Sequence, residues 1–89
     1  MNLRSALRLT DEPVELAVRT ASKDGRQVVS LRTVERGGRA VVNCEVYPVS
    51  GLTVEPLQPG PYTFATPQEA TSFVDEALEA LTYLGCDVR

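Results

Sequence analysis

The sequence predicts an α+β two-layer sandwich: an antiparallel meander of about four strands covered on one face by a single C-terminal helix. Three observations predict it. Two short turn signals separate runs of alternating apolar and polar residues, a Pro- and Gly-rich stretch follows them, and the chain closes with a long amphipathic segment. Runs of strands followed by one helix are typical of an antiparallel sheet with one covered face.

We expect one domain over residues 1–89, because a chain of this length can bury one compact core. It divides into an arm or extra strand (1–13), a three-stranded meander (14–47), a Pro- and Gly-rich loop (48–61), a short strand (62–65) and a helix (67–84). Residues 3–9 alternate in the manner of a strand, and a short helix over residues 2–9 is the rival interpretation. The apolar residues of the loop either pack under the helix edge or line a groove beside the third strand of the meander.

Two glycine-bearing turns set the expected register of the meander. Asp24-Gly25 and Gly37-Gly38 are both typical of two-residue hairpin turns, which need positive φ at both central positions. Folding about them places Leu31 between Val18 and Cys44. Because side chains alternate with period two, the two turns together predict one apolar face. Its members are Leu16, Val18, Thr20, Val29, Leu31, Thr33, Val42, Cys44 and Val46.

The helix carries start and stop signals. Thr66 and Glu69 form a capping box, with Pro67 at the first helical position and Gly85 where a left-handed C-cap is wanted. Cys86 would then contact Leu81 across the cap. One apolar stripe should face the sheet: Ala70, Phe73, Val74, Ala77, Leu78, Leu81 and Leu84.

A single helix leaves the other face of the sheet uncovered, and the sequence makes that face half apolar and rich in arginine. We select it as the candidate interface or binding surface. Its candidate residues are Arg19, Val28, Arg32, Val34, Val41, Asn43 and Tyr47.

Three interpretations of this face remain open. In the first, the face pairs with a second copy of itself in a two-fold dimer, which needs only one self-complementary patch. Alternatively, Arg19, Arg32 and Arg39 contact phosphates or another anion while Tyr47 stacks on a base. In the third interpretation its β-branched residues only favour strand formation and the face is solvated.

Composition excludes several chemistries. The chain has no histidine, and its two cysteines, Cys44 and Cys86, lack any C-x-x-C spacing. A histidine-assisted nucleophile and a typical zinc site are therefore excluded. We expect no enzymatic activity, no metal and no cofactor. The net charge of −3 and the pI of about 4.8 argue against nonspecific nucleic-acid binding.

The predicted helix carries carboxylates on its outer side. Carboxylates three or four residues apart on a helix usually belong to a solvated face. Alternatively, they could dock a basic protein partner near Tyr83. The residues are Glu69, Asp75, Glu76 and Glu79. With no apolar run of bilayer length, no signal-peptide pattern and both cysteines taken as reduced, we expect a cytoplasmic chain without a membrane partner.

The sequence thus predicts a small non-enzymatic interaction module of unspecified role, forming a homodimer through the outer sheet face. Nucleic-acid or anion binding by the arginine-rich face is the alternative. The order of strands followed by a helix resembles the layout of single-stranded nucleic-acid-binding coactivator domains. That resemblance is one of layout alone, and no residue is carried over from it.

Overall fold

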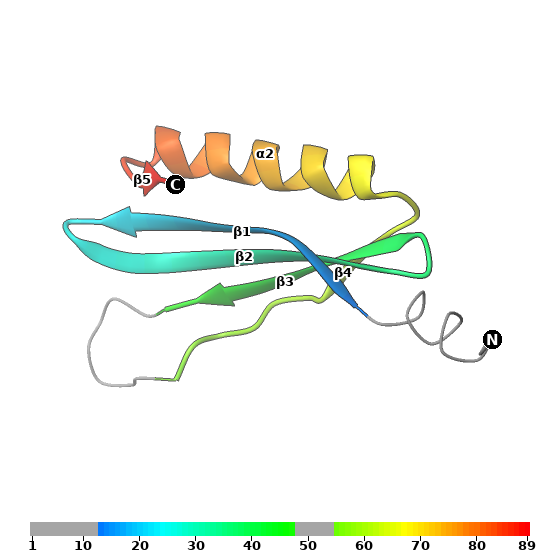
Figure 1. Cartoon of the computed structure of the whole chain (residues 1–89). Helices are drawn as coiled ribbons and strands as arrows, with labels where there is room; N and C mark the ends of the chain where they lie inside the picture. The colour runs from blue at the N-terminus through cyan, green and yellow to red at the C-terminus, as the bar shows by residue number, and fades with distance from the viewer. Residues whose placement is uncertain (1–12, 48–54) are drawn as a thin grey trace, which may run out of the picture.

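The computed structural model describes residues 13–47 and 55–89. These residues form an antiparallel five-stranded sheet with one helix packed across one face (Figure 1). The predicted α+β sandwich is therefore confirmed. The strand-or-helix question over residues 3–9, and the apolar loop residues Leu52 and Val54, lie outside the described residues.

The sheet contains one element that the sequence did not predict. Its spatial order is β4-β3-β2-β1-β5, and β5 is a two-residue strand after the helix that pairs antiparallel with β1. A strand of two residues has no periodicity to detect. The elements in chain order are β1 (Val14–Lys23), β2 (Arg26–Arg36), β3 (Arg39–Val46), β4 (Tyr62–Phe64), α2 (Pro67–Tyr83) and β5 (Asp87–Val88).

Both predicted hairpin turns are present. Asp24 and Gly25 have φ of 53° and 79°, and Gly37 and Gly38 have φ of 59° and 82°. Positive φ at both central residues is the type I′ geometry, which matches the twist of the flanking strands. Between β2 and β3 the register is the predicted one, with Leu31 opposite Cys44. The faces of these two strands are therefore as expected.

The predicted register between β1 and β2 is wrong over most of its length. Val18 lies opposite Arg32 rather than Leu31, and Ala21 rather than Thr20 lies opposite Val29. Two irregularities cause the shift, one between Ala21 and Ser22 and one between Glu15 and Ala17. The first leaves Val28 as an extra residue on β2, and the second leaves Leu16 as an extra residue on β1. Between these two bulges, every side chain of β1 is on the face opposite to the predicted one.

The shifted register suits the side chains that it buries. Ala21 is 0% exposed, paired with Val29 on one side and with Val88 of β5 on the other. The predicted register would instead have placed the hydroxyl of Thr20 in this position. A buried hydroxyl without a partner costs about 1–3 kcal/mol, whereas alanine buries no polar group. We infer that tight packing beside β5 favours the bulged pairing.

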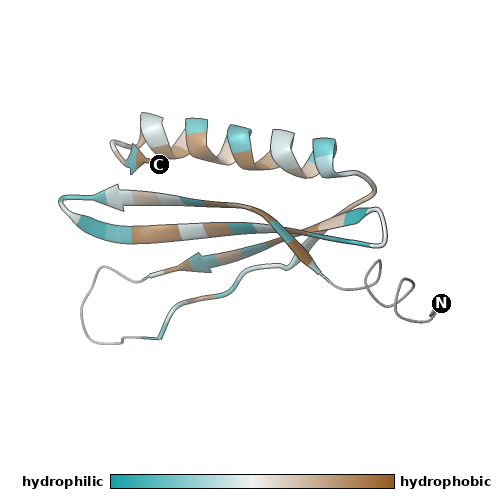
Figure 2. Ribbon diagram, viewed as in Figure 1, coloured by the Kyte–Doolittle hydropathy of each residue, from teal (hydrophilic) through white to brown (hydrophobic). Residues whose placement is uncertain are grey.

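The core lies between α2 and the middle of the sheet. It is formed by Leu31, Ala40 and Val42 from β2 and β3, together with three helical residues, Ala70, Val74 and Leu78. The apolar side of α2 faces the sheet and its hydrophilic side faces away (Figure 2). Six of the seven predicted stripe residues are buried or partly buried here: Ala70, Phe73, Val74, Ala77, Leu78 and Leu81.

Both ends of α2 carry the predicted caps. The Glu69 N–H donates to the Thr66 hydroxyl at 3.2 Å, which satisfies one of the free donors of the first turn. At the other end Gly85 has φ of 91°, its N–H donates to the Thr82 carbonyl, and the Cys86 N–H donates to the Leu81 carbonyl. This pair of bonds is the Schellman motif.

Leu84 does not join the core as predicted. It is the C-cap residue, with φ of −83° and ψ of 4°, and it is 67% exposed. Because the backbone leaves the helical conformation at Leu84, its side chain departs from the stripe that points at the sheet.

The observed register makes a prediction about stability. Leu31→Ala should lower the free energy of unfolding by about 2–5 kcal/mol, because it empties a buried site. Val18→Ala should cost less than about 1 kcal/mol, because that side chain is 42% exposed and lies outside the core. Chemical denaturation of the two variants measures both values. Equal losses would contradict the bulged register and support the pairing of Val18 with the core.

Candidate functional site

The candidate site is the side of β1, β2 and β3 that faces away from α2, which we call the outer face. Among the described residues, no helix or strand is layered over it (Figure 1). The register of the three strands assigns the following residues to this face: Val18, Ser30, Arg32, Val34, Val41, Asn43 and Glu45.

One end of the outer face is apolar. Val34 lies directly opposite Val41, and Val18 lies opposite Arg32 on the neighbouring strand. Val18 is 42% exposed, and the bulged Leu16 beside it is 44% exposed. We call Val18, Val34 and Val41 the outer apolar cluster. Val34 and Val41 are half-buried, so Val18 is the member of the cluster with the most apolar surface left in contact with water.

The centre of the outer face holds one ion pair. The Nε atom of Arg32 lies 3.1 Å from Oε1 of Glu15, and both side chains are more than half exposed. Such a surface pair contributes about 0–1 kcal/mol. Its effect is positional, because it holds the guanidinium across the strands and neutralises it locally.

The other end of the outer face is polar and hollowed. Glu45 accepts from the Tyr47 hydroxyl at 3.4 Å and from the Gln58 side-chain amide at 3.3 Å. Gln58 belongs to the segment that runs along the edge of β3, where Leu57 and Val46 exchange two main-chain hydrogen bonds. A cavity of about 300 Å³ lies between this segment and the outer face. Its lining includes Ser30, Arg32, Asn43, Glu45 and residues 58–61.

The described part of the predicted loop lies beside β3 and not beneath the helix. Leu57 is 63% exposed, so it does not pack under the helix edge. Residues 58–61 line a hollow beside β3, but Leu57 is not part of its lining, so groove lining by the apolar loop residues stays a prediction.

Six of the seven predicted surface residues lie on the outer face or at its polar end. Arg32, Val34, Val41 and Asn43 have the expected register positions. Val28 is the bulged residue of β2, and its carbonyl accepts from the N–H of Tyr47 at 2.9 Å.

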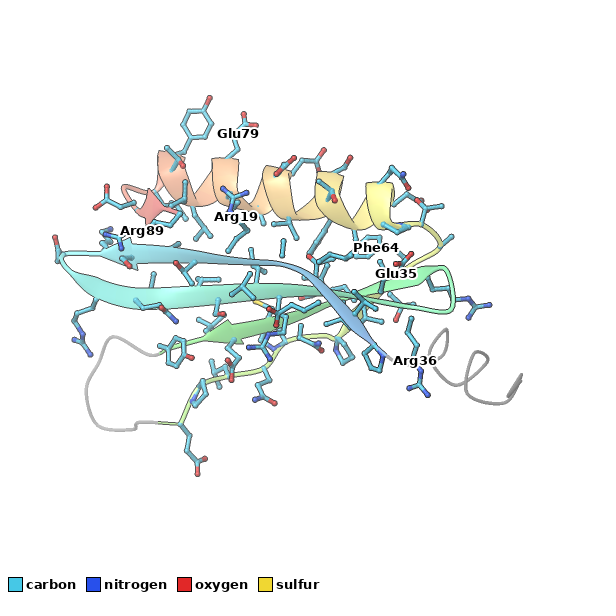
Figure 3. The ribbon with its side chains drawn as sticks, viewed as in Figure 1. Arg19, Glu35, Arg36, Phe64, Glu79 and Arg89 are labelled. Carbon is cyan, nitrogen blue, oxygen red and sulfur yellow. The ribbon has the colours of Figure 1, made fainter. Side chains whose placement is uncertain are left out.

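The placement of Arg19 on the outer face is wrong. Arg19 pairs with Leu31, which puts it on the helix side, and its Nε donates to the main-chain oxygen of Arg89 at 2.7 Å. Figure 3 shows Arg19 between β1 and α2. Arg39 pairs with Arg36 at the β2–β3 turn, away from the centre of the sheet. The three proposed anion contacts, Arg19, Arg32 and Arg39, therefore do not form one cluster.

Sequence reasoning missed Val18 as a surface residue because it assumed regular pairing from the turn onward. The signal was present in the composition of β1. β1 contains the small residue Ala21, and small residues are the ones that tolerate close approach of a neighbouring element. Only the packing of β5 against Ala21 shows which set of alternating β1 side chains is buried.

The thiol of Cys44 is protected from ionisation. Burial raises its pKa above the ordinary value, and the neighbouring Glu45 carboxylate raises it further. A thiol with a raised pKa is a weak nucleophile at neutral pH. Cys44 packs against the core as a partly buried residue, on the side of the sheet that the sequence predicts to be apolar.

Within residues 13–47 and 55–89, no three acidic, cysteine or histidine side chains are grouped so as to hold a metal ion. The one helix in those ranges is too short and too polar to cross a membrane. Comparisons of the chain with protein families, curated proteins and solved structures found no match.

The raised pKa of Cys44 predicts a pH dependence. In a Cys86→Ser variant, alkylation of Cys44 by iodoacetamide should reach half its maximal rate at higher pH in the folded chain than in urea. The pKa of Cys44 is higher in the folded chain than in the unfolded chain. Its contribution to the free energy of unfolding is therefore fully present below the unfolded pKa and is lost as pH rises through the folded pKa. An unshifted or lower midpoint in the folded chain would contradict the assigned environment.

Proposed function

We propose that this protein is a non-enzymatic interaction module that self-associates through the outer face of its sheet. The observation that supports the proposal is the outer apolar cluster, which lies on a face without a covering layer among the described residues. The β1 bulges enlarge this cluster, because they add Val18 to the predicted Val34 and Val41. Val18 is exposed and Val34 and Val41 are half-buried, and apolar groups that keep contact with water on an uncovered face favour burial against a partner.

A second copy is the partner that the outer face fits best. A two-fold interface needs a single self-complementary patch. The outer face provides apolar side chains at one end, a neutralised ion pair at its centre and the uncompensated carboxylate of Glu45 at the other. It therefore presents no large excess of one charge that would repel an identical surface.

The size of the outer face limits the affinity. Over the 8 residues of β3, the three strands cover roughly 26 Å by 14 Å, on the order of 400 Å² per copy. A standard stable interface buries about 800 Å² per partner. We therefore expect a weak dimer that dissociates on dilution.

Anion or nucleic-acid binding by the arginines is the weaker candidate. Arg32 is already paired with Glu15, and Arg19 lies on the helix side of the sheet with its Nε bonded to Arg89. Neither residue is left free to join the other around one phosphate.

Light scattering across a dilution series tests the dimer. The wild-type chain should shift from monomer at about 1 µM to mostly dimer toward 1 mM, the range expected of a small interface. Val18→Lys should weaken the dimer at least about tenfold, because it places a charge in the apolar cluster. Leu84→Lys, the same change at an exposed apolar residue at the end of α2, is the matched control and should leave the dimer unchanged. A wild-type chain that stays monomeric near 1 mM would contradict the proposal, as would equal weakening by both variants.

A further inference from the structure

A second surface lies on the helix side of the sheet, well apart from the outer face. It is a shallow groove of about 430 Å³ between α2 and the edge strand β4, which we call the α2–β4 groove. Its lining residues are Phe64, Gln68, Glu69, Ser72, Phe73 and Glu76.

The floor of the α2–β4 groove is aromatic. The ring centroid of Phe73 lies 5.2 Å from that of Phe64 and 5.0 Å from that of Tyr62, with interplanar angles of 43° and 42°. Phe64 and Phe73 are only partly buried, and Tyr62 is 37% exposed. Figure 3 shows Phe64 directed into the space between the sheet and the first turns of α2. Partly exposed aromatic rings in a groove floor attract cationic side chains as well as apolar ones.

The rim of the groove is acidic and lacks a counter-charge. Glu69 and Glu76 stand seven residues apart on one side of α2, about 10 Å along the axis. Neither carboxylate has an ion pair among the residues that the structure describes, and α2 itself contains no basic residue. Glu69 Oε1 accepts from the Thr66 hydroxyl at 3.3 Å, which leaves Oε2 available. A cationic group entering over the aromatic floor would meet both carboxylates.

The edge of β4 beside the groove is open. On β3 the main-chain groups of Val46 bond Leu57, whereas the N–H of Tyr47 bonds Val28 of β2. Along a strand, the main-chain N–H and C=O groups of successive residues point alternately to the two neighbouring strands. Val42 and Ala40 therefore direct these groups at Tyr62 and Phe64 of β4, as Val46 does at Leu57. The N–H and C=O of Thr63 must then point away from the sheet, and no hydrogen bond among the described residues uses them. An extended peptide can pair with β4 at this position.

We propose that the α2–β4 groove binds an extended segment of a different protein that carries two basic residues separated by one residue. The central residue pairs with the main chain of Thr63. Its two neighbours then direct their side chains to the helix side, about 7 Å apart, over Phe64 and Phe73. Long lysine or arginine side chains from these positions reach Glu69 and Glu76, forming charge-assisted hydrogen bonds over an aromatic floor.

The pattern of basic residues in this chain argues against a second copy as the occupant. Its lysine and arginines are never two positions apart at any point of the sequence. A strand from another copy could therefore place at most one cation in the groove. The groove and the outer face consequently serve different partners, and their tests are separate.

Fluorescence anisotropy with a labelled peptide tests the proposal on the full chain. The probe is Gly-Ser-Thr-Arg-Val-Arg-Thr-Ser-Gly, and the matched control peptide exchanges the central Val with one Arg so that the two arginines are adjacent. Composition and charge are identical, but only the alternating peptide puts both arginines on one side. It should bind at least about tenfold more tightly than the control peptide.

Two helix variants separate the groove from general charge attraction. Glu76→Lys reverses a charge on the rim, whereas Asp75→Lys makes the same change at the adjacent residue, which does not line the groove. Binding should fall about tenfold in the first variant and less than about twofold in the second. Thr63→Pro, which removes the edge N–H, should also weaken binding. Val18→Lys should bind the peptide as the wild type does, even if it disrupts the dimer.

Two outcomes would overturn the proposal. Equal affinity for the two peptides, or equal effects of the two helix variants, would show nonspecific attraction to an acidic helix. A change of oligomeric state in Glu76→Lys, together with no peptide binding by the wild type, would show that the groove is a contact between copies of this chain.

Discussion

The pairing of β1 with β2 is the constraint on which the rest of the structure depends. Two single-residue bulges, at Val28 and Leu16, enclose a stretch in which every β1 side chain is turned to the opposite face. This shift buries Ala21, brings Arg19 to the helix side and leaves Val18 on the outer face. A regular ladder would have produced a less apolar outer face and would have placed the hydroxyl of Thr20 beside the core.

The C-terminal end of the fold is built on the same stretch of β1. Thr20 and Arg89 exchange main-chain hydrogen bonds of 3.3 and 2.9 Å, and the Arg19 guanidinium donates to the same oxygen of Arg89. The Lys23 ammonium donates to the carbonyl of Leu84 at 3.1 Å, which satisfies a free acceptor at the end of α2. The Schellman turn therefore directs the chain into β5, which pairs with β1. The two bulges determine which side chains of β1 face the helix at that point. Helix, cap and β5 are coupled through β1.

The features that the sequence predicts correctly are the ones set by short-range chemistry. Positive φ at Asp24-Gly25 and Gly37-Gly38, and the caps at Thr66 and Gly85, each depend on a few neighbouring residues. They give the fold class, the faces of β2 and β3, and most of the outer face. The bulges, β5 and the α2–β4 groove could not be predicted in this way, because each depends on contacts between distant segments. Phe64 and Phe73 form a groove floor only because β4 pairs at the edge of the sheet beneath the first turns of α2.

Nuclear Overhauser contacts between Hα protons test the bulged register most directly. Since Thr20 directs its main-chain groups at Arg89, Val18 and Arg32 form a pair without mutual hydrogen bonds, with Cα atoms about 4.5 Å apart. We expect strong Hα–Hα contacts between Val18 and Arg32 and between Thr20 and Ser30. Contacts that instead pair Val18 with Leu31, or Thr20 with Val29, would show a regular ladder and contradict the assignment of both faces.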